Sequence, residues 1–202
     1  MNKDILICGV GGQGTVLASK ILAGAALEEG NIVHSAETIG MAQRGGSVTS
    51  HVRIGDKARS PLIPCGKAEL MLAFEPSEAV RNLNYLKPDS LAVVNTTPVK
   101  PVTESLAQTG YDGKEMTAYL KKKFRCIFID SDAVCAPFGS TKFFNIIILG
   151  VAAGAGETGM SKETLLAQID RRVPEKYREI NRQAFLAGYE IGEKEKNLNE
   201  NK

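Results

Sequence analysis

The chain has 202 residues, a formal net charge of +2 at pH 7 and an apolar content of 43%. A chain of this length and composition can bury a sizeable core, and we expect one domain over residues 1–192 followed by a polar tail over 193–202. The charges are nearly balanced and scattered, which argues against nucleic acid as a partner.

The chain opens with a strand, a glycine-rich turn and a helix. An apolar run, Ile5–Cys8, precedes the turn, and Leu17–Ala25 follows it with apolar residues at helical spacing. Gly9 and Gly11 permit a sharp turn that can approach a bound group, while Gly14 lets the helix lie close to the strand. Because a helix N-terminus presents free N–H groups and partial positive charge, the turn is predicted to hold an anion such as phosphate. The alternative is a tight turn that binds nothing.

A second polar, glycine-rich cluster follows the predicted second strand. Glu37 lies at the end of that strand, where an acid in a dinucleotide-binding fold would bond ribose hydroxyls. Arg44 stands beside two flexible peptides, Gly45 and Gly46, which suits contact with a phosphate or carboxylate. A loop whose glycines only permit a turn is the alternative interpretation.

The rest of the chain alternates strands with helices. The pattern predicts strands over 47–54, 69–74, 91–95 and 126–129, and helices after Ser77, over 116–124, around Asn145, after Ser161 and from Pro174. Residues 47–54 alternate, with Thr49, His51 and Arg53 on a solvent-exposed face, and a turn follows. We therefore expect an α/β fold: a three-layer Rossmann-like domain with a mainly parallel sheet and an antiparallel excursion after the second strand.

Asn145 lies in a segment that is apolar almost all round, so its helix is expected to be buried. A buried amide needs hydrogen-bond partners, and Asn145 is therefore predicted to bond backbone or another side chain. Small residues that follow, including Gly150 and Gly154, predict close packing of this helix, either within the domain or against a partner subunit.

Few other side chains suggest chemistry. Asp130 and Asp132 end a predicted strand, where paired acids can bind a metal or act as acid and base, although capping of the next segment is favoured. The two histidines have no second ligand at a telling spacing. The four cysteines are far apart, so no metal site or iron–sulfur cluster is predicted on this chain. No catalytic residue is assigned.

No membrane association is predicted. The longest apolar stretch falls well short of the roughly 20 residues that a membrane span requires. The first apolar run is short and followed by glycines, unlike a signal peptide. A cytoplasmic protein is expected.

Taken together, the two glycine-rich clusters are more specific than either alone. They read Gly9, Gly11, Gly12, Gln13 and Gly14, then Glu37, Thr38, Gly40, Gln43, Arg44, Gly45, Gly46 and Val48. This combination resembles the gamma-type subunit of the 2-oxoacid:acceptor (ferredoxin) oxidoreductases, and within them is most similar to the beta subunit of indolepyruvate:ferredoxin oxidoreductase. The similarity extends from about Asp4 to about Gly192.

The resemblance implies oxidative decarboxylation of a 2-oxoacid, with coenzyme A accepting the acyl group and ferredoxin the electrons. Thiamine diphosphate and iron–sulfur clusters serve such chemistry, and this chain has a recognisable signature for neither. Both are therefore expected mainly on a larger partner subunit, with self-association of this chain in isolation left open. The residues expected to close the active site or shape a coenzyme site are Gly9, Gly11, Gly12, Gln13, Gly14, Glu37, Thr38, Gln43, Arg44, Gly45 and Gly46.

Two other functions are compatible with the sequence. The glycine turn and Glu37 would also suit an independent NAD(P)-binding oxidoreductase, although no catalytic pair in a substrate domain accompanies them. A non-catalytic docking scaffold, in which the glycine turn is structural, is the other alternative.

Overall fold

The computed structural model describes residues 1–40, 45–99 and 110–200. Its single sheet has the strand order β2-β3-β1-β4-β5-β6. The strands are β1 (Lys3–Val10), β2 (Val33–Ile39), β3 (Ser47–Ile54), β4 (Ala68–Ala73), β5 (Leu86–Asn95) and β6 (Arg125–Ile129).

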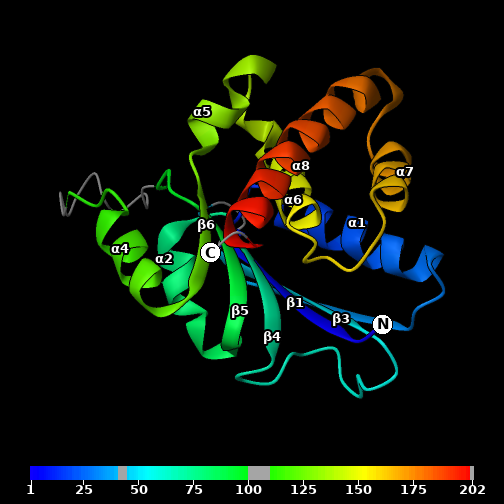
Figure 1. Cartoon of the computed structure of the whole chain (residues 1–202), viewed down its shortest axis with the longest axis horizontal. Coiled ribbons are helices and arrows are strands. Elements are labelled where there is room, and N and C mark those ends of the chain that lie inside the picture. The colour runs from blue at the N-terminus through cyan, green and yellow to red at the C-terminus, as the bar shows by residue number, and fades with distance from the viewer. Residues whose placement is uncertain (41–44, 100–109, 201–202) are drawn as a thin grey trace.

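Strands β1, β4, β5 and β6 run parallel, and β3 pairs antiparallel with both β1 and β2 (Figure 1). The predicted α/β fold with its antiparallel excursion after the second strand is confirmed. The central strands are continuous apolar runs because helices cover both of their faces, as in Ile5–Cys8, which is fully buried.

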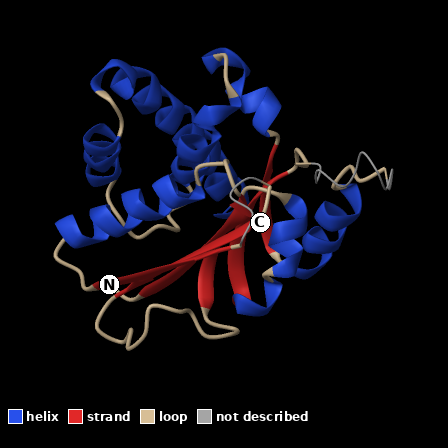
Figure 2. Ribbon diagram, turned by 180° about the vertical axis from the view of Figure 1, so that it is seen from behind, coloured by secondary structure: helices blue, strands red, loops and turns tan. Residues whose placement is uncertain are grey.

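Helices cover the two faces of the sheet (Figures 1 and 2). One face carries the long helices and the other carries two shorter ones. The first set is α1 (Thr15–Glu28), α6 (Phe144–Gly154), α7 (Lys162–Arg172) and α8 (Arg178–Glu200), and the second is α2 (Pro76–Arg81) and α4 (Lys114–Lys123). Short helix α5 (Ser131–Cys135) follows β6, and 3-10 turns occupy Leu83–Tyr85, Ala136–Phe138, Thr141–Phe143 and Glu175–Tyr177.

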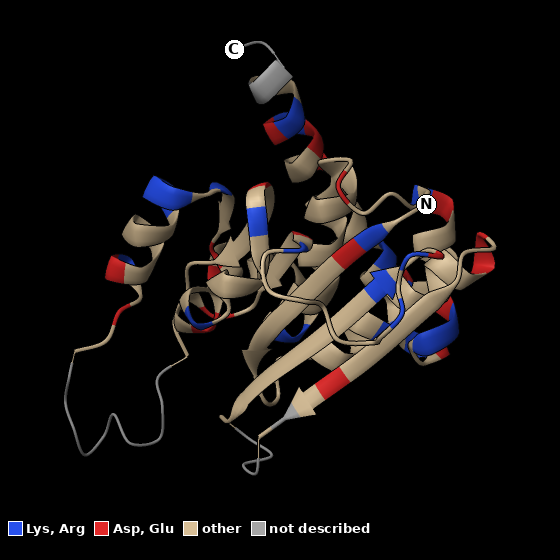
Figure 3. Cartoon of the chain, turned by 90° about the horizontal axis from the view of Figure 1, so that it is seen from below, with Lys and Arg blue, Asp and Glu red and all other residues tan. Residues whose placement is uncertain are grey.

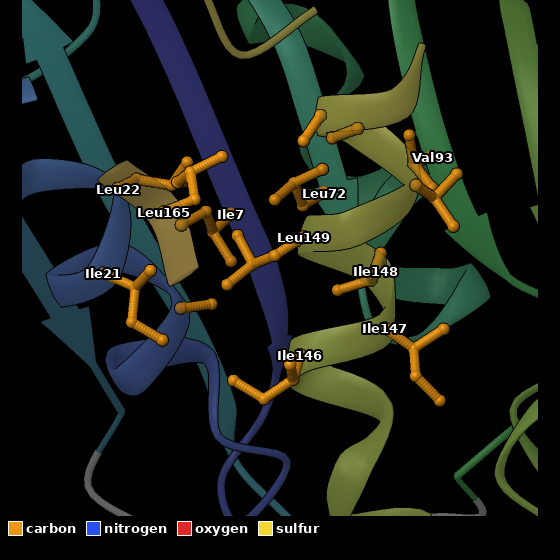
Figure 4. Close-up of a cluster of buried hydrophobic side chains, with 14 of the residues drawn as sticks. Ile7, Ile21, Leu22, Leu72, Val93, Ile146, Ile147, Ile148, Leu149 and Leu165 are labelled. Carbon is orange, nitrogen blue, oxygen red and sulfur yellow. The ribbon is translucent and has the colours of Figure 1, made fainter. Parts of the chain in front are cut away.

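Helix α6 lies at the centre of the larger core. Its apolar side chains meet those of β1, β4, β5, α1 and α7 (Figure 4). On its other side it crosses α8 at very short range: a Cβ at Gly150, Gly154 or Gly188 would overlap backbone of the facing helix. The small residues predicted to allow close packing therefore serve packing within the domain.

Two local predictions are wrong. His51, expected on a solvent-exposed face, is only 2% exposed, because the connection between β3 and β4 covers it and the Ile63 N–H donates to its Nδ1 at 3.2 Å. The residues after Gly192, expected to be a polar tail that follows the domain, instead continue helix α8 as far as Glu200.

Charged residues lie mostly on helices and loops, with few on the strands (Figure 3). Within the described ranges, no single helix is both long and apolar enough to cross a membrane, although the bent pair Ser131–Phe138 and Thr141–Gly154 has that length and composition when the two are joined.

Candidate functional site

The glycine turn and the second cluster meet at one edge of the sheet. Strands β1, β4, β5 and β6 end at this edge, and the β2–β3 connection lies there too, since Ser47 pairs with Val10. The Gly11 N–H donates to the Gly46 carbonyl at 2.8 Å, and the Gly45 N–H donates to the Gly11 carbonyl at 3.3 Å. Two sequence motifs that are separated by about two dozen residues therefore lie side by side.

Two glycines of the turn have steric roles. A Cβ at Gly9 would lie 2.7 Å from Gln13 Oε1 and 2.8 Å from Phe74 Cβ. Gly14 adopts a left-handed φ of 82°, and a Cβ there would lie 2.6 Å from Asn145 Nδ2. Glycine at these positions lets the turn fold tightly against β4 and α6.

Gln13 is fully engaged within the chain. Its Oε1 accepts from the Val10 N–H at 2.8 Å, and its Nε2 donates to the Phe74 carbonyl at 2.8 Å. Asn95 donates to the same carbonyl at 3.0 Å, and its Oδ1 accepts from the Ser131 N–H at 3.1 Å. Two amide side chains therefore bridge the ends of β1, β4, β5 and β6 and hold this edge rigid.

A cleft of about 260 Å³ opens at the same edge. The glycine turn, the residues after β5 and β6, and the first turn of α6 surround it. Its lining comprises Gly12, Gln13, Gly14, Asn95, Thr97, Val99, Ser131, Asp132, Thr141, Lys142, Phe144 and Asn145. Clefts outside the carboxyl ends of parallel strands are the usual ligand sites of such folds.

The prediction that Asn145 is hydrogen-bonded is wrong. Its side chain is only 6% exposed, yet no residue in the described part of the chain bonds its carboxamide. It lies beneath Gly14, at the start of α6, and lines the cleft. Among the described residues only Ser50 Oγ is a fully buried side-chain polar atom without a partner, so the Asn145 amide retains access to solvent in the cleft.

None of the other predicted site residues that the structure describes, Gly9 and Gly11 among them, lines the cleft. Glu37 and Thr38 are exposed near the end of β2, and the Glu37 carboxylate lies 3.2 Å from the Ser19 hydroxyl of α1. Gln43 and Arg44 fall outside the described residues. Gly45 and Gly46 contact the glycine turn through Gly11, as described above.

Two buried acids were missed by the sequence analysis. Glu75, 1% exposed, caps α2 by accepting from the N–H groups of Ser77 and Glu78 at 2.7 and 3.1 Å, and accepts from the Tyr111 hydroxyl at 2.6 Å. The helix expected after Ser77 therefore begins one residue earlier, at Pro76, with Glu75 as its cap. Glu78, 3% exposed, accepts from the Ser47 hydroxyl at 2.6 Å. The capping role of Glu75 could be read from the Glu-Pro-Ser sequence, but its long-range partner could not.

These acids alter the titration of their neighbours. Burial, with the hydrogen bond to Glu75, raises the pKa of Tyr111 to about 12. Burial, reinforced by Glu78 and Glu75, raises the pKa of Cys8 well above its ordinary value. Cys8 is thus a protonated core thiol. Asp130 caps α5, as favoured above. No group of three or more His, Cys, Asp or Glu side chains in the described ranges could hold a metal.

The parallel strands, the glycine turn and the cleft beyond the strand ends define a Rossmann-like α/β protein. Residues 4–191 match the pyruvate ferredoxin/flavodoxin oxidoreductase family, and the chain belongs to that family.

Relatives extend over nearly the whole chain. Indolepyruvate oxidoreductase subunit IorB of Archaeoglobus fulgidus is 37% identical over 94% of this chain and 94% of its own length. The protein of the same name from Pyrococcus horikoshii is 34% identical over 96% of this chain and 98% of its own. The resemblance inferred from the two glycine clusters is confirmed.

A solved structure shares the fold. The gamma subunit of keto/oxoacid ferredoxin oxidoreductase from Geobacter sulfurreducens has a TM-score of 0.69 and 24% identity, covering 94% of this chain and 98% of that one. This similarity establishes the fold alone.

Proposed function

We propose that this chain is the smaller subunit of a hetero-oligomeric 2-oxoacid:ferredoxin oxidoreductase of the indolepyruvate type. The names and full-length coverage of its relatives support this assignment. The observation that carries it is the pair of hydrogen bonds joining Gly11 to Gly45 and Gly46, because they bring the two distinguishing motifs to the ligand-binding edge.

The complex would catalyse the coenzyme A-dependent oxidative decarboxylation of an aryl pyruvate, with electrons passing to ferredoxin. When bound, thiamine diphosphate supplies the electron sink and iron–sulfur clusters the electron path. The described cysteines and acids of this chain provide no clustered donor set, so the larger partner subunit is proposed to hold these groups. The small subunit is accordingly inactive alone.

This chain is proposed to shape the coenzyme side of the shared active site. Gly9, Gly14 and Gln13 hold the turn in place, which leaves the backbone of Gly12 at the cleft. The remaining predicted residues, Glu37, Thr38, Gln43, Arg44, Gly45 and Gly46, would complete the wall on the partner side. We further propose a single domain over residues 1–192 and a cytoplasmic location.

Anaerobic affinity purification of the full chain from its native host tests the subunit assignment. A brown eluate containing a larger subunit, iron and thiamine diphosphate is expected. A colourless chain, alone or self-associated, would contradict the proposal and direct attention to NAD(P) binding.

The substrate is tested on the purified complex by reduction of ferredoxin with coenzyme A present. Indolepyruvate should give a higher kcat/KM than pyruvate or 2-oxoglutarate. Preference for pyruvate or 2-oxoglutarate would reject the aryl assignment while leaving the subunit assignment intact.

A further inference from the structure

We propose that Glu78 is a positioning residue for the shared active site, and that it acts through the Ser47 hydroxyl. Ser47 directly follows Gly45 and Gly46 of the second glycine-rich cluster. This inference rests on the proposed function. It adds a residue of α2, a helix that neither glycine-rich cluster includes.

Ser47 is the residue at which three parts of this edge meet. Its carbonyl accepts the Gly40 N–H at 3.2 Å, a bond that closes the base of the β2–β3 connection. In the sheet Ser47 pairs with Val10, the last residue of β1. One position earlier, the Gly46 carbonyl accepts the Gly11 N–H at 2.8 Å. A displacement of Ser47 therefore moves the second cluster relative to the glycine turn.

Glu78 holds this junction from the first turn of α2. The residue is 3% exposed, and its Oε2 accepts from the Ser47 hydroxyl at 2.6 Å. Its Oε1 lies 3.3 Å from an Arg81 guanidinium nitrogen, but the Arg81 side chain is 64% exposed, and an ion pair this exposed contributes little to stability. Ser47 is therefore the partner that fixes the buried end of this carboxylate.

The neighbouring carboxylate of Glu75 has a different task. It caps α2 by accepting the Ser77 and Glu78 N–H groups, and this structural role accounts for its burial. An acid in the first turn, such as Glu78, also suits the helix dipole, but that interaction does not require burial. The Glu78 side chain instead reaches a residue 31 positions away in the sequence. Its burial is explained by the contact with β3.

The contact fixes the second cluster before a ligand arrives. A hydrogen bond to a carboxylate is stronger than one between neutral groups, and Ser47 is held by it in addition to its backbone bonds. Fixing a binding wall in advance lowers the free-energy cost of binding. Because the larger subunit is proposed to hold thiamine diphosphate, losing this bond should weaken the use of coenzyme A more than it slows the chemical step.

Ferredoxin reduction by the purified complex, with coenzyme A varied, tests this role. Ser47→Ala removes the hydroxyl and should raise the KM for coenzyme A about fivefold or more, with kcat within about twofold of wild type. Tyr111→Phe is the matched control, because the Tyr111 hydroxyl also donates at 2.6 Å to a buried carboxylate of α2, that of Glu75. Its KM should stay within about twofold of wild type. A merely structural role of Ser47 would lower the amount of active complex and leave KM unchanged.

Variants of Glu78 test whether it acts through Ser47. Glu78→Gln keeps an oxygen that accepts from the hydroxyl, so its KM should stay within about twofold of wild type, whereas Glu78→Ala should raise KM as Ser47→Ala does. The double variant Ser47→Ala/Glu78→Ala should match Ser47→Ala within about twofold, since both changes remove the same hydrogen bond. Urea unfolding of each isolated chain verifies that it is folded. Should Glu78→Ala not fold, Ser47→Ala and Tyr111→Phe still decide the question.

A wild-type KM in Ser47→Ala would overturn the proposal, as would equal increases in Ser47→Ala and Tyr111→Phe. Either result, obtained with a wild-type complex that reduces ferredoxin, would leave the proposed function intact. A chain that purifies without a larger subunit would instead reject the proposed function and this inference together.

Discussion

At the scale of single residues, glycines in one short turn have different tasks. Gly12 and Gly14 both have positive φ, of 104° and 82°. A Cβ at Gly12 would meet nothing within 4 Å, whereas one at Gly14 would press on Asn145. Backbone strain therefore acts at both positions, and steric exclusion acts only at Gly14.

Gly14→Ala should lower the free energy of unfolding by about 1–2 kcal/mol more than Gly12→Ala, because it adds a clash to the same backbone strain. Urea unfolding of both variants measures the difference. Equal losses would show that the contact with Asn145 relaxes without cost.

The glycine turn was predicted correctly from the sequence, whereas the hydrogen bonding of the Asn145 side chain was not. Spacing predicts a turn between strand and helix, and the turn is there. Spacing does not reveal that both amide atoms of Gln13 form hydrogen bonds within the chain. Nor does it reveal that Asn145, expected to be hydrogen-bonded, has no partner among the described residues. Hydrogen bonds between residues far apart in sequence depend on strand register and on how helices cross the sheet, which local sequence patterns do not encode.

His51 makes the stability of the fold depend on pH. Burial, and secondarily Arg53, lower the pKa of His51, while Asp4 opposes them. Its Nδ1 accepts the Ile63 N–H, which also requires the neutral ring. The unfolded chain gains a proton as pH falls through about 6.5, but the folded chain does not until its lower pKa is reached. The stability that neutral His51 contributes is thus present above about pH 6.5 and is lost as pH falls from there toward the lower pKa of the folded chain.

His51→Gln should therefore flatten the loss of stability between pH 7.5 and 5.5, since glutamine can still accept the Ile63 N–H without titrating. Unfolding by urea at both pH values measures this slope. The same slope in wild type and variant would remove His51 as its cause.

At the scale of elements, α6 and α8 illustrate what periodicity predicts and what it leaves open. Apolar runs and small residues predicted a buried, closely packed α6. They left open whether α8 or another subunit fills the contact, because small residues suit either. The structure places Gly188 of α8 against the Ile147 carbonyl of α6. The four parallel strands followed from pattern more easily, since short continuous apolar runs are typical of strands buried on both faces.

Gly188→Ala should lower the free energy of unfolding by about 1–3 kcal/mol, because the added methyl meets backbone that cannot move aside. Gly24→Ala in α1 is the control, where the methyl would meet only the flexible ends of Gln168 and Arg172. That variant should change stability by less than about 1 kcal/mol, since alanine also favours the helix by about that amount. Similar losses for both variants would contradict a rigid α6–α8 contact.

At the scale of the whole molecule, two arginines are expected to serve different purposes, one in the fold and one in function. Arg53 is tied into the fold: its guanidinium bonds Asp4 at 2.8 and 3.2 Å and the Ser60 carbonyl at 3.0 Å. Arg44 lies outside the described residues, one position before Gly45, which bonds the glycine turn at the edge where the parallel strands end. We therefore expect replacement by alanine to lower turnover at Arg44 and to lower the stability of the fold at Arg53.

Arg44→Ala should lower turnover of the assembled oxidoreductase about tenfold or more, about 1.4 kcal/mol in the barrier. The unfolding free energy of the isolated chain should change by less than about 0.5 kcal/mol. Arg53→Ala should lower that free energy by about 1.5–3 kcal/mol, since it breaks hydrogen bonds to a charged group, and leave turnover per assembled complex unchanged.

Ferredoxin reduction by the purified complex and urea unfolding of the isolated chain measure the two effects separately. Equal turnover of Arg44→Ala and wild type would reject a role for this cation in the active site. Failure of Arg44→Ala to assemble, with its fold intact, would favour the docking scaffold, because the side chain would then be needed to recruit the partner. Intact assembly with lost turnover would support a subunit that shapes the active site and would argue against a passive scaffold.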